Sequence, residues 1–135
     1  MLLGLALGDT GIADIAQRRP ASLAPHERHT PAGRFESQPG HNDRGEAIVW
    51  IDYAASLAIH RLRPAPAGER RVERLVSTTP DDNRITLGCI VVPVAFYEAV
   101  VEPLLGWQRG VVYVLPEARP VHTLFCKLDP DFAMR

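Results

Sequence analysis

Prolines and glycines interrupt this chain too often to allow long helices or long unbroken strands. Of its 135 residues, 12 are proline and 10 are glycine, and they recur through most of the sequence. Proline lacks an amide hydrogen, and glycine has no side chain to restrict the backbone, so both break regular structure. The pattern favours a mainly β fold of short strands and turns with a few short helices.

The remaining composition is that of one globular domain. Hydrophobic residues make up 46% and charged residues 23%, and a chain of this length can bury a core. Fifteen basic and sixteen acidic side chains leave a net charge of −1, which provides no field for nucleic acid or an anionic membrane. No apolar run is long enough to span a membrane. The opening MLLGLALGDT lacks a basic start, so no signal peptide is visible and a first strand is predicted.

Short apolar runs bounded by turn residues predict the strands. Two of them are continuously apolar, which indicates burial on both faces of a sheet. A long polar segment at 17–46 is predicted to be loop with one short strand at 33–35, and 78–83 is predicted to be a second loop. The predicted strands are 1–8, 47–52, 56–62 and 110–115, the middle two being the continuous runs.

Helical spacing of apolar residues occurs twice. A short amphipathic helix is predicted within 69–77, where positions 72, 75 and 76 are apolar. A second helix is predicted to begin at Pro93, since proline suits a first turn. Its apolar face is formed by positions 96, 100 and 104, and Pro103 and Gly106 mark its end.

The stretch RITLGCIVVP, residues 84–93, contains the first candidate for chemistry. Cys89 follows Gly88 and precedes an apolar run. Free cysteine is often a small buried hydrophobe, so a structural role competes with that of a nucleophile. Gly88 gives the backbone freedom for a sharp turn, and the Gly88 and Cys89 N–H groups are then placed to face a developing oxyanion.

A nucleophilic cysteine needs a base, and five histidines are available. His60 lies within the apolar run LAIHRL, where it is either a satisfied core histidine or a base beside the thiol. His26 and His29 in HERH belong to the polar loop, and no further ligands complete a zinc site there. No metal and no cofactor are predicted, because glycine-rich phosphate or dinucleotide motifs are also lacking in the sequence.

Several segments, taken in order, resemble the L,D-transpeptidase catalytic domain family (YkuD-like). The resemblance covers about residues 1–117, and its most specific part is a Thr-x-Gly-Cys core with an upstream histidine on a strand. The segments are TPAGRF (30–35), WIDYAASLAIHRL (50–62), RITLGCIVVP (84–93), FYEAVVEPLL (96–105) and VVYVLPE (111–117).

The resemblance implies an L,D-transpeptidase-like β-sandwich and acyl transfer on peptidoglycan stem peptides through a thioester on Cys89. His60 then takes the place of the base, and Arg61 orients the imidazole through its backbone carbonyl. Gly88 and Cys89 supply the oxyanion N–H groups, and Thr86 occupies the supporting hydroxyl position. The implied domain is 1–119, missing an N-terminal strand, with 120–135 as a C-terminal tail.

Family members act in the periplasm or cell envelope, so the resemblance implies that location and peptidoglycan peptides as partners. The chain departs from the family at Leu87, where histidine is usual, and at Val91, where asparagine or arginine is usual. Both changes remove polar groups near the cysteine. A relative that binds peptidoglycan without turnover is therefore the alternative, and a structural domain with an inert Cys89 is the third reading.

Two further residues are candidates for substrate binding. Tyr53, together with Trp50, either walls a substrate groove or fills the core. Arg84 either meets a stem-peptide carboxylate or is an ordinary surface arginine. Cys126 lies outside the matching segments and is predicted to be non-catalytic; whether it pairs with Cys89 does not follow from sequence.

Overall fold

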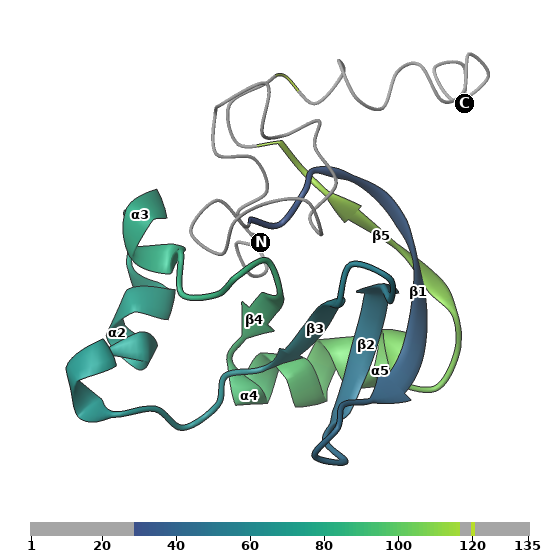
Figure 1. The fold of residues 1–135 in the computed structure, drawn as a ribbon, viewed down its shortest axis with the longest axis horizontal. Coiled ribbons are helices and arrows are strands. Elements are labelled where there is room, and N and C mark those ends of the chain that lie inside the picture. Colours follow the sequence, from purple (N-terminus) through teal and green to yellow (C-terminus); the bar gives the residue numbers. More distant parts are fainter. Residues whose placement is uncertain (1–28, 117–119, 121–135) are drawn as a thin grey trace.

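The computed structural model describes residues 29–116 and Pro120. In this part of the chain, five strands form one curled sheet in the order β4-β3-β2-β1-β5, accompanied by short helices (Figure 1). The predicted mainly β class with a few short helices is confirmed. The predicted strand at 1–8 and the predicted tail lie outside the described residues, apart from Pro120.

Strand β1, Gly33–His41, is the longest strand and joins the two halves of the sheet. Its residues 33–37 pair with β5, Gly110–Val114, and its residues 38–41 pair with β2, Ala47–Asp52. The short strand predicted at 33–35 is confirmed as the start of β1, and the prediction of loop is wrong from residue 36 to residue 41. Pro39 is tolerated because it lies beyond the end of the β5 pairing, so on that side no ladder bond is broken.

Strands β2 and β3 form an antiparallel hairpin, and β4 adds to β3 in parallel. Strand β3 is Leu57–Arg61 and β4 is Ile90–Val92. The strands predicted at 47–52, 56–62 and 110–115 are confirmed as β2, β3 and β5. Four consecutive residues of β3, Leu57 to His60, are buried, which confirms that this strand is covered on both faces.

The crossover from β3 to β4 contains three short helical turns, which are η3 (Ala67–Glu69), α2 (Arg71–Val76) and α3 (Pro80–Asn83). Helix α2 confirms the helix predicted within 69–77, but it buries none of its residues. Val72 is 65% exposed and Val76 is 72% exposed. The prediction that 78–83 is loop is wrong from residue 80 to residue 83, because α3 forms there with proline in its first turn.

After β4 the chain forms one continuous helical segment made of α4 (Val94–Phe96), η4 (Tyr97–Val101) and α5 (Glu102–Leu105). Its buried residues are Tyr97 and Val101, whereas Leu104 is 62% exposed. The apolar face is therefore displaced by one residue from the prediction. Pro103 does not end the helix. The π-helical turn η4 precedes it, and a changed hydrogen-bond pattern accommodates the missing amide hydrogen.

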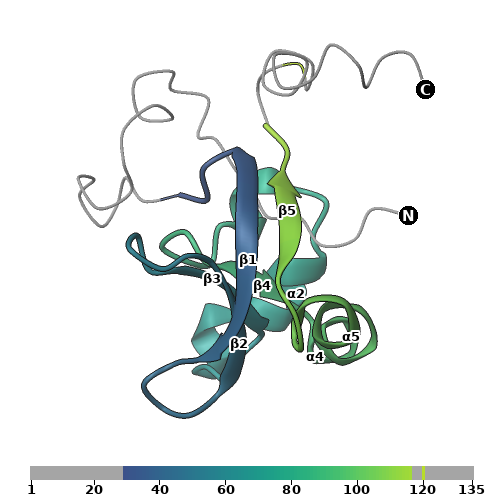
Figure 2. The same cartoon turned by 90° about the vertical axis from the view of Figure 1, so that its right-hand side faces the viewer.

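This helical segment covers one face of the sheet and completes the core (Figure 2). Side chains from all layers contribute to the core, namely Val49, Ile51, Leu57, Ile59, Ile90, Val92, Tyr97, Val101 and Val114. The helix thus fixes which face of each strand is internal. The opposite face of the sheet carries the candidate site.

Candidate active site

The parallel pairing of β3 with β4 brings the segments of His60 and Cys89 together. Ile59 pairs with Ile90, and both side chains point into the core. Side chains alternate along strands, so His60 and the residue before Ile90, Cys89, belong to the opposite, outer face. With about 3.3 Å of rise per residue and about 4.8 Å between strands, their Cα atoms lie roughly 8 Å apart. In the described part of the chain no hydrogen bond joins the two side chains, because His60 Nδ1 bonds to the Arg61 carbonyl oxygen and Cys89 Sγ to that of Ser56.

The His60 ring is oriented by the residue that follows it. Its Nδ1 lies 2.8 Å from the backbone carbonyl oxygen of Arg61. A carbonyl oxygen can only accept a hydrogen bond, so Nδ1 carries the proton and donates it. In the neutral ring, Nε2 then has an unprotonated lone pair. This tautomer is the one that a base toward a thiol requires.

Burial disfavours the protonated form of this imidazole. His60 is 7% exposed, and desolvation lowers its pKa below the ordinary value of 6.5. The Arg61 carbonyl raises the pKa, but this effect is smaller than that of burial. Val91, the register partner of His60, is 8% exposed and contributes apolar surface to the same face. The valine that departs from the family pattern thus belongs to the apolar setting of His60.

The Arg61 side chain takes no part in this site. Its guanidinium lies over the Tyr97 ring, 4.0 Å from the ring centre, and its Nη1 donates to the carbonyl oxygen of Ala47 at 3.2 Å. Nη2 also lies 3.4 Å from a carboxylate oxygen of Glu102. These contacts hold the side chain against the helical layer. Only the backbone carbonyl of Arg61 faces His60, as the resemblance implies.

Two threonine hydroxyl groups donate hydrogen bonds to the backbone of the loop that carries Cys89. The Thr86 hydroxyl donates to the carbonyl oxygen of Cys89 at 2.7 Å. From a distant part of the chain, the Thr30 hydroxyl donates to the carbonyl oxygen of Gly88, also at 2.7 Å. Gly88 has φ +121°, and a Cβ there would lie 2.8 Å from Leu57 Cδ2 and 3.0 Å from the His29 carbonyl oxygen. Only glycine fits this position.

The predicted oxyanion donors require one correction. The Gly88 N–H donates to the Thr86 hydroxyl at 3.3 Å, so it does not point freely into the site. A bond of that length is weak, and an oxyanion would have to replace it. The Cys89 N–H stays the simpler candidate for this role.

Sequence reasoning did not identify two residues that contact the cysteine loop. Cys89 is a half-buried free thiol whose Sγ lies 3.6 Å from the carbonyl oxygen of Ser56. Ser56 has φ +57°, a conformation that is uncommon for a residue with a side chain. Thr30 is the second such residue. The run TPAGRF placed it in a matching segment, but nothing local indicates a partner that lies 58 positions away.

The two residues predicted to bind substrate, Arg84 and Tyr53, differ in their surroundings. Arg84 makes an ion pair with Asp81, and both side chains are exposed, which fits the reading of an ordinary surface arginine. Tyr53 is 77% exposed and contacts Trp50, with ring centres 5.0 Å apart at 72°. These two aromatic residues line a cavity and do not fill the core. Leu87, two residues before Cys89, is 59% exposed.

Within residues 29–116, no three histidine, cysteine or acidic side chains are grouped so that they could bind a metal ion. The same described part of the chain contains no helix of the length and apolar character needed to cross a membrane. His26 and Cys126 lie outside the described residues.

Comparison with protein-family models, curated proteins and solved structures finds no match to this chain.

Proposed function

We propose that this protein is a cysteine acyltransferase of the L,D-transpeptidase type, acting on peptidoglycan stem peptides in the periplasm or cell envelope. The proposal includes the finer fold assignment, an L,D-transpeptidase-like β-sandwich. The observation that carries it is the hydrogen bond from His60 Nδ1 to the Arg61 carbonyl, with Cys89 directly before the neighbouring strand β4. That contact sets the tautomer which a thiol base needs.

In the proposed reaction, His60 Nε2 accepts the proton of the Cys89 thiol as Sγ attacks a stem-peptide carbonyl carbon. The carbonyl oxygen becomes an oxyanion, to which the Cys89 N–H donates. When the tetrahedral intermediate collapses, the carbon–nitrogen bond breaks and the terminal D-amino acid leaves with the proton from the imidazolium. Cys89 now carries a thioester. An acceptor amine or water then attacks it, its proton passes through His60, and the thiol is restored.

The site's electrostatics support this sequence of steps. A neutral imidazole can accept a proton, and burial keeps His60 neutral over a wider pH range than an exposed histidine. The Thr86 and Thr30 hydrogen bonds fix the backbone on either side of the nucleophile. Such fixed geometry reduces the entropy cost of bringing the thiol to the carbonyl.

A relative that binds peptidoglycan without turnover is the second candidate. The bond between the Gly88 N–H and Thr86 favours it, because one expected oxyanion donor is already occupied. The absence of polar side chains at Leu87 and Val91 points the same way. A binding protein would retain affinity for the stem peptide and release no D-amino acid.

Acylation by a carbapenem distinguishes the two functions, since this β-lactam presents a strained carbonyl to a nucleophilic thiol. The expected result is one adduct on Cys89, measured by intact mass and located by peptide mapping. Cys126→Ser is the matched control and should keep the adduct, whereas Cys89→Ser should lose it. His60→Gln should slow acylation by a factor of about 10² or more.

If the folded wild-type protein gains no carbapenem mass and still binds a muropeptide tetrapeptide, acyl transfer is rejected and binding without turnover is supported. An adduct that persists in Cys89→Ser would place the reactive thiol elsewhere. Turnover is then measured directly by incubating the protein with a disaccharide-tetrapeptide. Release of the terminal D-amino acid by wild type, but not by Cys89→Ser, completes the assignment of an acyltransferase.

A further inference from the structure

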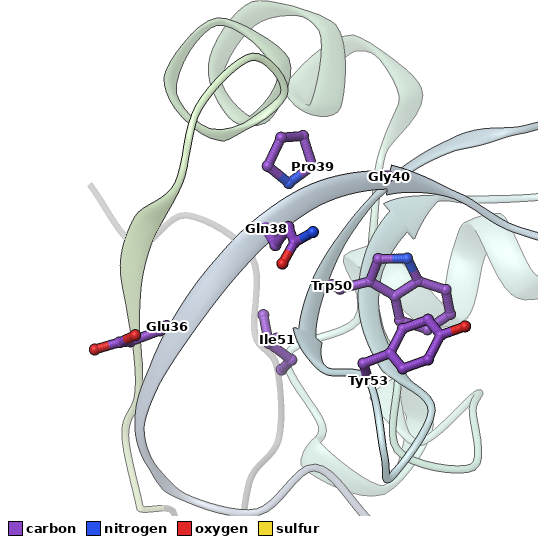
Figure 3. A pocket seen from close by; sticks show the side chains of 7 residues that line it. All are labelled: Glu36, Gln38, Pro39, Gly40, Trp50, Ile51 and Tyr53. Atoms are coloured by element: carbon purple, nitrogen blue, oxygen red, sulfur yellow. The ribbon is translucent and has the colours of Figure 1, made fainter.

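A cavity of about 440 Å³ opens where β1 separates from β2. The two strands pair as far as Gln38 and Trp50, after which β1 turns to pair with β5 through Ser37 and Gly110. Residues of both strands and the following turn line the cavity, namely Glu36, Gln38, Pro39, Gly40, Trp50, Ile51 and Tyr53 (Figure 3). Its volume falls within the range of small-molecule sites.

Two aromatic rings form one wall of this cavity. Trp50 and Tyr53 meet edge to face, and Tyr53 is 77% exposed, so much of its ring is open to a ligand. The Trp50 indole can occupy its position only because residue 40 is glycine. A Cβ on residue 40 would lie 2.7 Å from both Cδ1 and Nε1 of Trp50. The indole therefore rests directly on the β1 backbone, and this support holds the aromatic wall in place.

One polar side chain of β1, Gln38, lies toward that wall, whereas Glu36 points away from the two rings (Figure 3). Gln38 Oε1 accepts a hydrogen bond from Arg109 at 3.4 Å, which leaves its NH₂ group to act as a donor. Glu36 lies 3.6 Å from the Arg34 guanidinium, so its carboxylate is paired and is directed away from the rings. A cation stacked on the rings would therefore meet no carboxylate of the cavity lining. The pattern suits a neutral ligand with hydroxyl groups and one apolar face.

We propose that this cavity binds a ring of a neutral saccharide, which stacks on Tyr53 and Trp50 while its hydroxyl groups bond to Gln38. A pyranose has the required combination, because its C–H groups form an apolar face and its hydroxyls both donate and accept. The amide N–H groups of Gln38 and the indole N–H of Trp50 donate to these hydroxyls.

The cavity and the thiol share one short turn. Residues 53–56 connect β2 to β3, and this turn presents the Tyr53 ring to the cavity and the Ser56 carbonyl oxygen to Cys89 Sγ. Asp52 fixes the turn by accepting a hydrogen bond from the Ala55 N–H at 3.0 Å. Trp50 pairs with Ala58, which lies beside Cys89 if the parallel ladder is extended by one residue. Two strand spacings, about 10 Å, therefore separate Trp50 from the cysteine.

One ligand can span that distance. If the proposed acyl transfer is correct, on which this step rests, the saccharide is the sugar that carries the stem peptide, and the peptide extends along the outer face to Cys89. The substrate class is then a glycopeptide and not a free peptide. Saccharide binding itself needs neither the thiol nor the histidine.

The test uses the full chain and an N-acetylglucosamine trimer, with binding followed by calorimetry. Wild type is expected to bind the trimer, and Tyr53→Ala should weaken the affinity about tenfold, as loss of an aromatic contact does. Tyr53→Phe keeps the ring and should stay within about twofold of wild type. Tyr113→Ala, at another exposed tyrosine, is the matched control and should bind normally. Circular dichroism confirms that each variant is folded.

Cys89→Ser separates this proposal from the proposed function, because it abolishes acylation and should leave the affinity for the trimer unchanged. Failure of wild type to bind the trimer at millimolar concentration would overturn the saccharide site, whatever the carbapenem result. Equal affinity in wild type and a folded Tyr53→Ala would also overturn it. So would binding of tetramethylammonium in place of the trimer, which would identify the cavity as a cation site.

Discussion

The Thr30 hydroxyl donates a hydrogen bond to the carbonyl oxygen of Gly88 at 2.7 Å, across 58 positions of sequence. Thr30 is 4% exposed, so the bond is shielded from water. It ties the segment before β1 to the loop that carries Cys89. The stability of the fold and the position of the candidate nucleophile are therefore linked through one contact.

Replacing Thr30 by valine should reduce the free energy of unfolding by about 1–3 kcal/mol, because the Gly88 carbonyl stays buried without its partner. Urea unfolding measures the change. Thr30→Ser restores the hydroxyl and should recover most of the loss, and Thr78→Val at an exposed position should have little effect. Equal stability of Thr30→Val and wild type would show that the bond contributes nothing.

Gly88→Ala should destabilise the protein by about 1–3 kcal/mol or more, because both the backbone angle and the space oppose a side chain. The added Cβ would collide with Leu57 and with the His29 backbone, which cannot both yield. Thermal unfolding followed by circular dichroism checks this. Gly68→Ala, where a Cβ meets nothing within 4 Å, is the control and should unfold near the wild-type temperature.

Stability should fall as the pH is lowered through the range just below 6.5, because the folded state resists protonation of His60. Burial lowers the His60 pKa when folded, so the unfolded chain binds a proton first. The contribution of His60 is complete above pH 6.5 and is lost as the pH decreases toward the folded pKa. Urea midpoints measured from pH 8 to pH 5 test this. His60→Gln should flatten the profile, whereas His41→Gln, at an exposed position, should preserve it.

Gly40→Ala should displace the Trp50 indole and alter the environment of its fluorescence. The new methyl group would occupy the space 2.7 Å from the indole, so the ring has to move toward solvent or distort β1. A red-shifted emission maximum and weaker binding of the N-acetylglucosamine trimer are the expected results. Gly68→Ala serves again as the control. An unchanged spectrum would mean that the indole does not rest on Gly40.

Local sequence patterns predicted the strands with continuous apolar runs. The runs that became β2 and β3 have enough β-branched and apolar residues to be recognised alone, and β5 is equally clear. The patterns failed where pairing overrides local composition. Strand β1 contains Pro39 and Gly40, which indicate a loop, yet pairing with β2 and β5 along its length holds it extended.

The helices show the same division. The period of the apolar residues located α2 and the segment from Val94 to Leu105, but it assigned the wrong buried face to the second. The displacement is already present at Tyr97, the first residue of the π-helical turn, so packing against the sheet and not helical spacing decided the buried face. Helix α2 has apolar residues at helical spacing and still buries none of them. It belongs to the crossover that connects β3 to the edge strand β4.

The sequence by itself determined the mainly β class, three of the five strands, and the pair of residues, Cys89 and His60, on which a proposed chemistry depends. Only the tertiary structure decided that the parallel pairing of β3 with β4 brings their segments together, that Thr30 and Ser56 contact the cysteine loop, and that β1 and β2 separate around a cavity. The physical reason is that local propensity acts over a few neighbouring residues. Contacts between distant segments depend on strand register, which is set when the whole core packs.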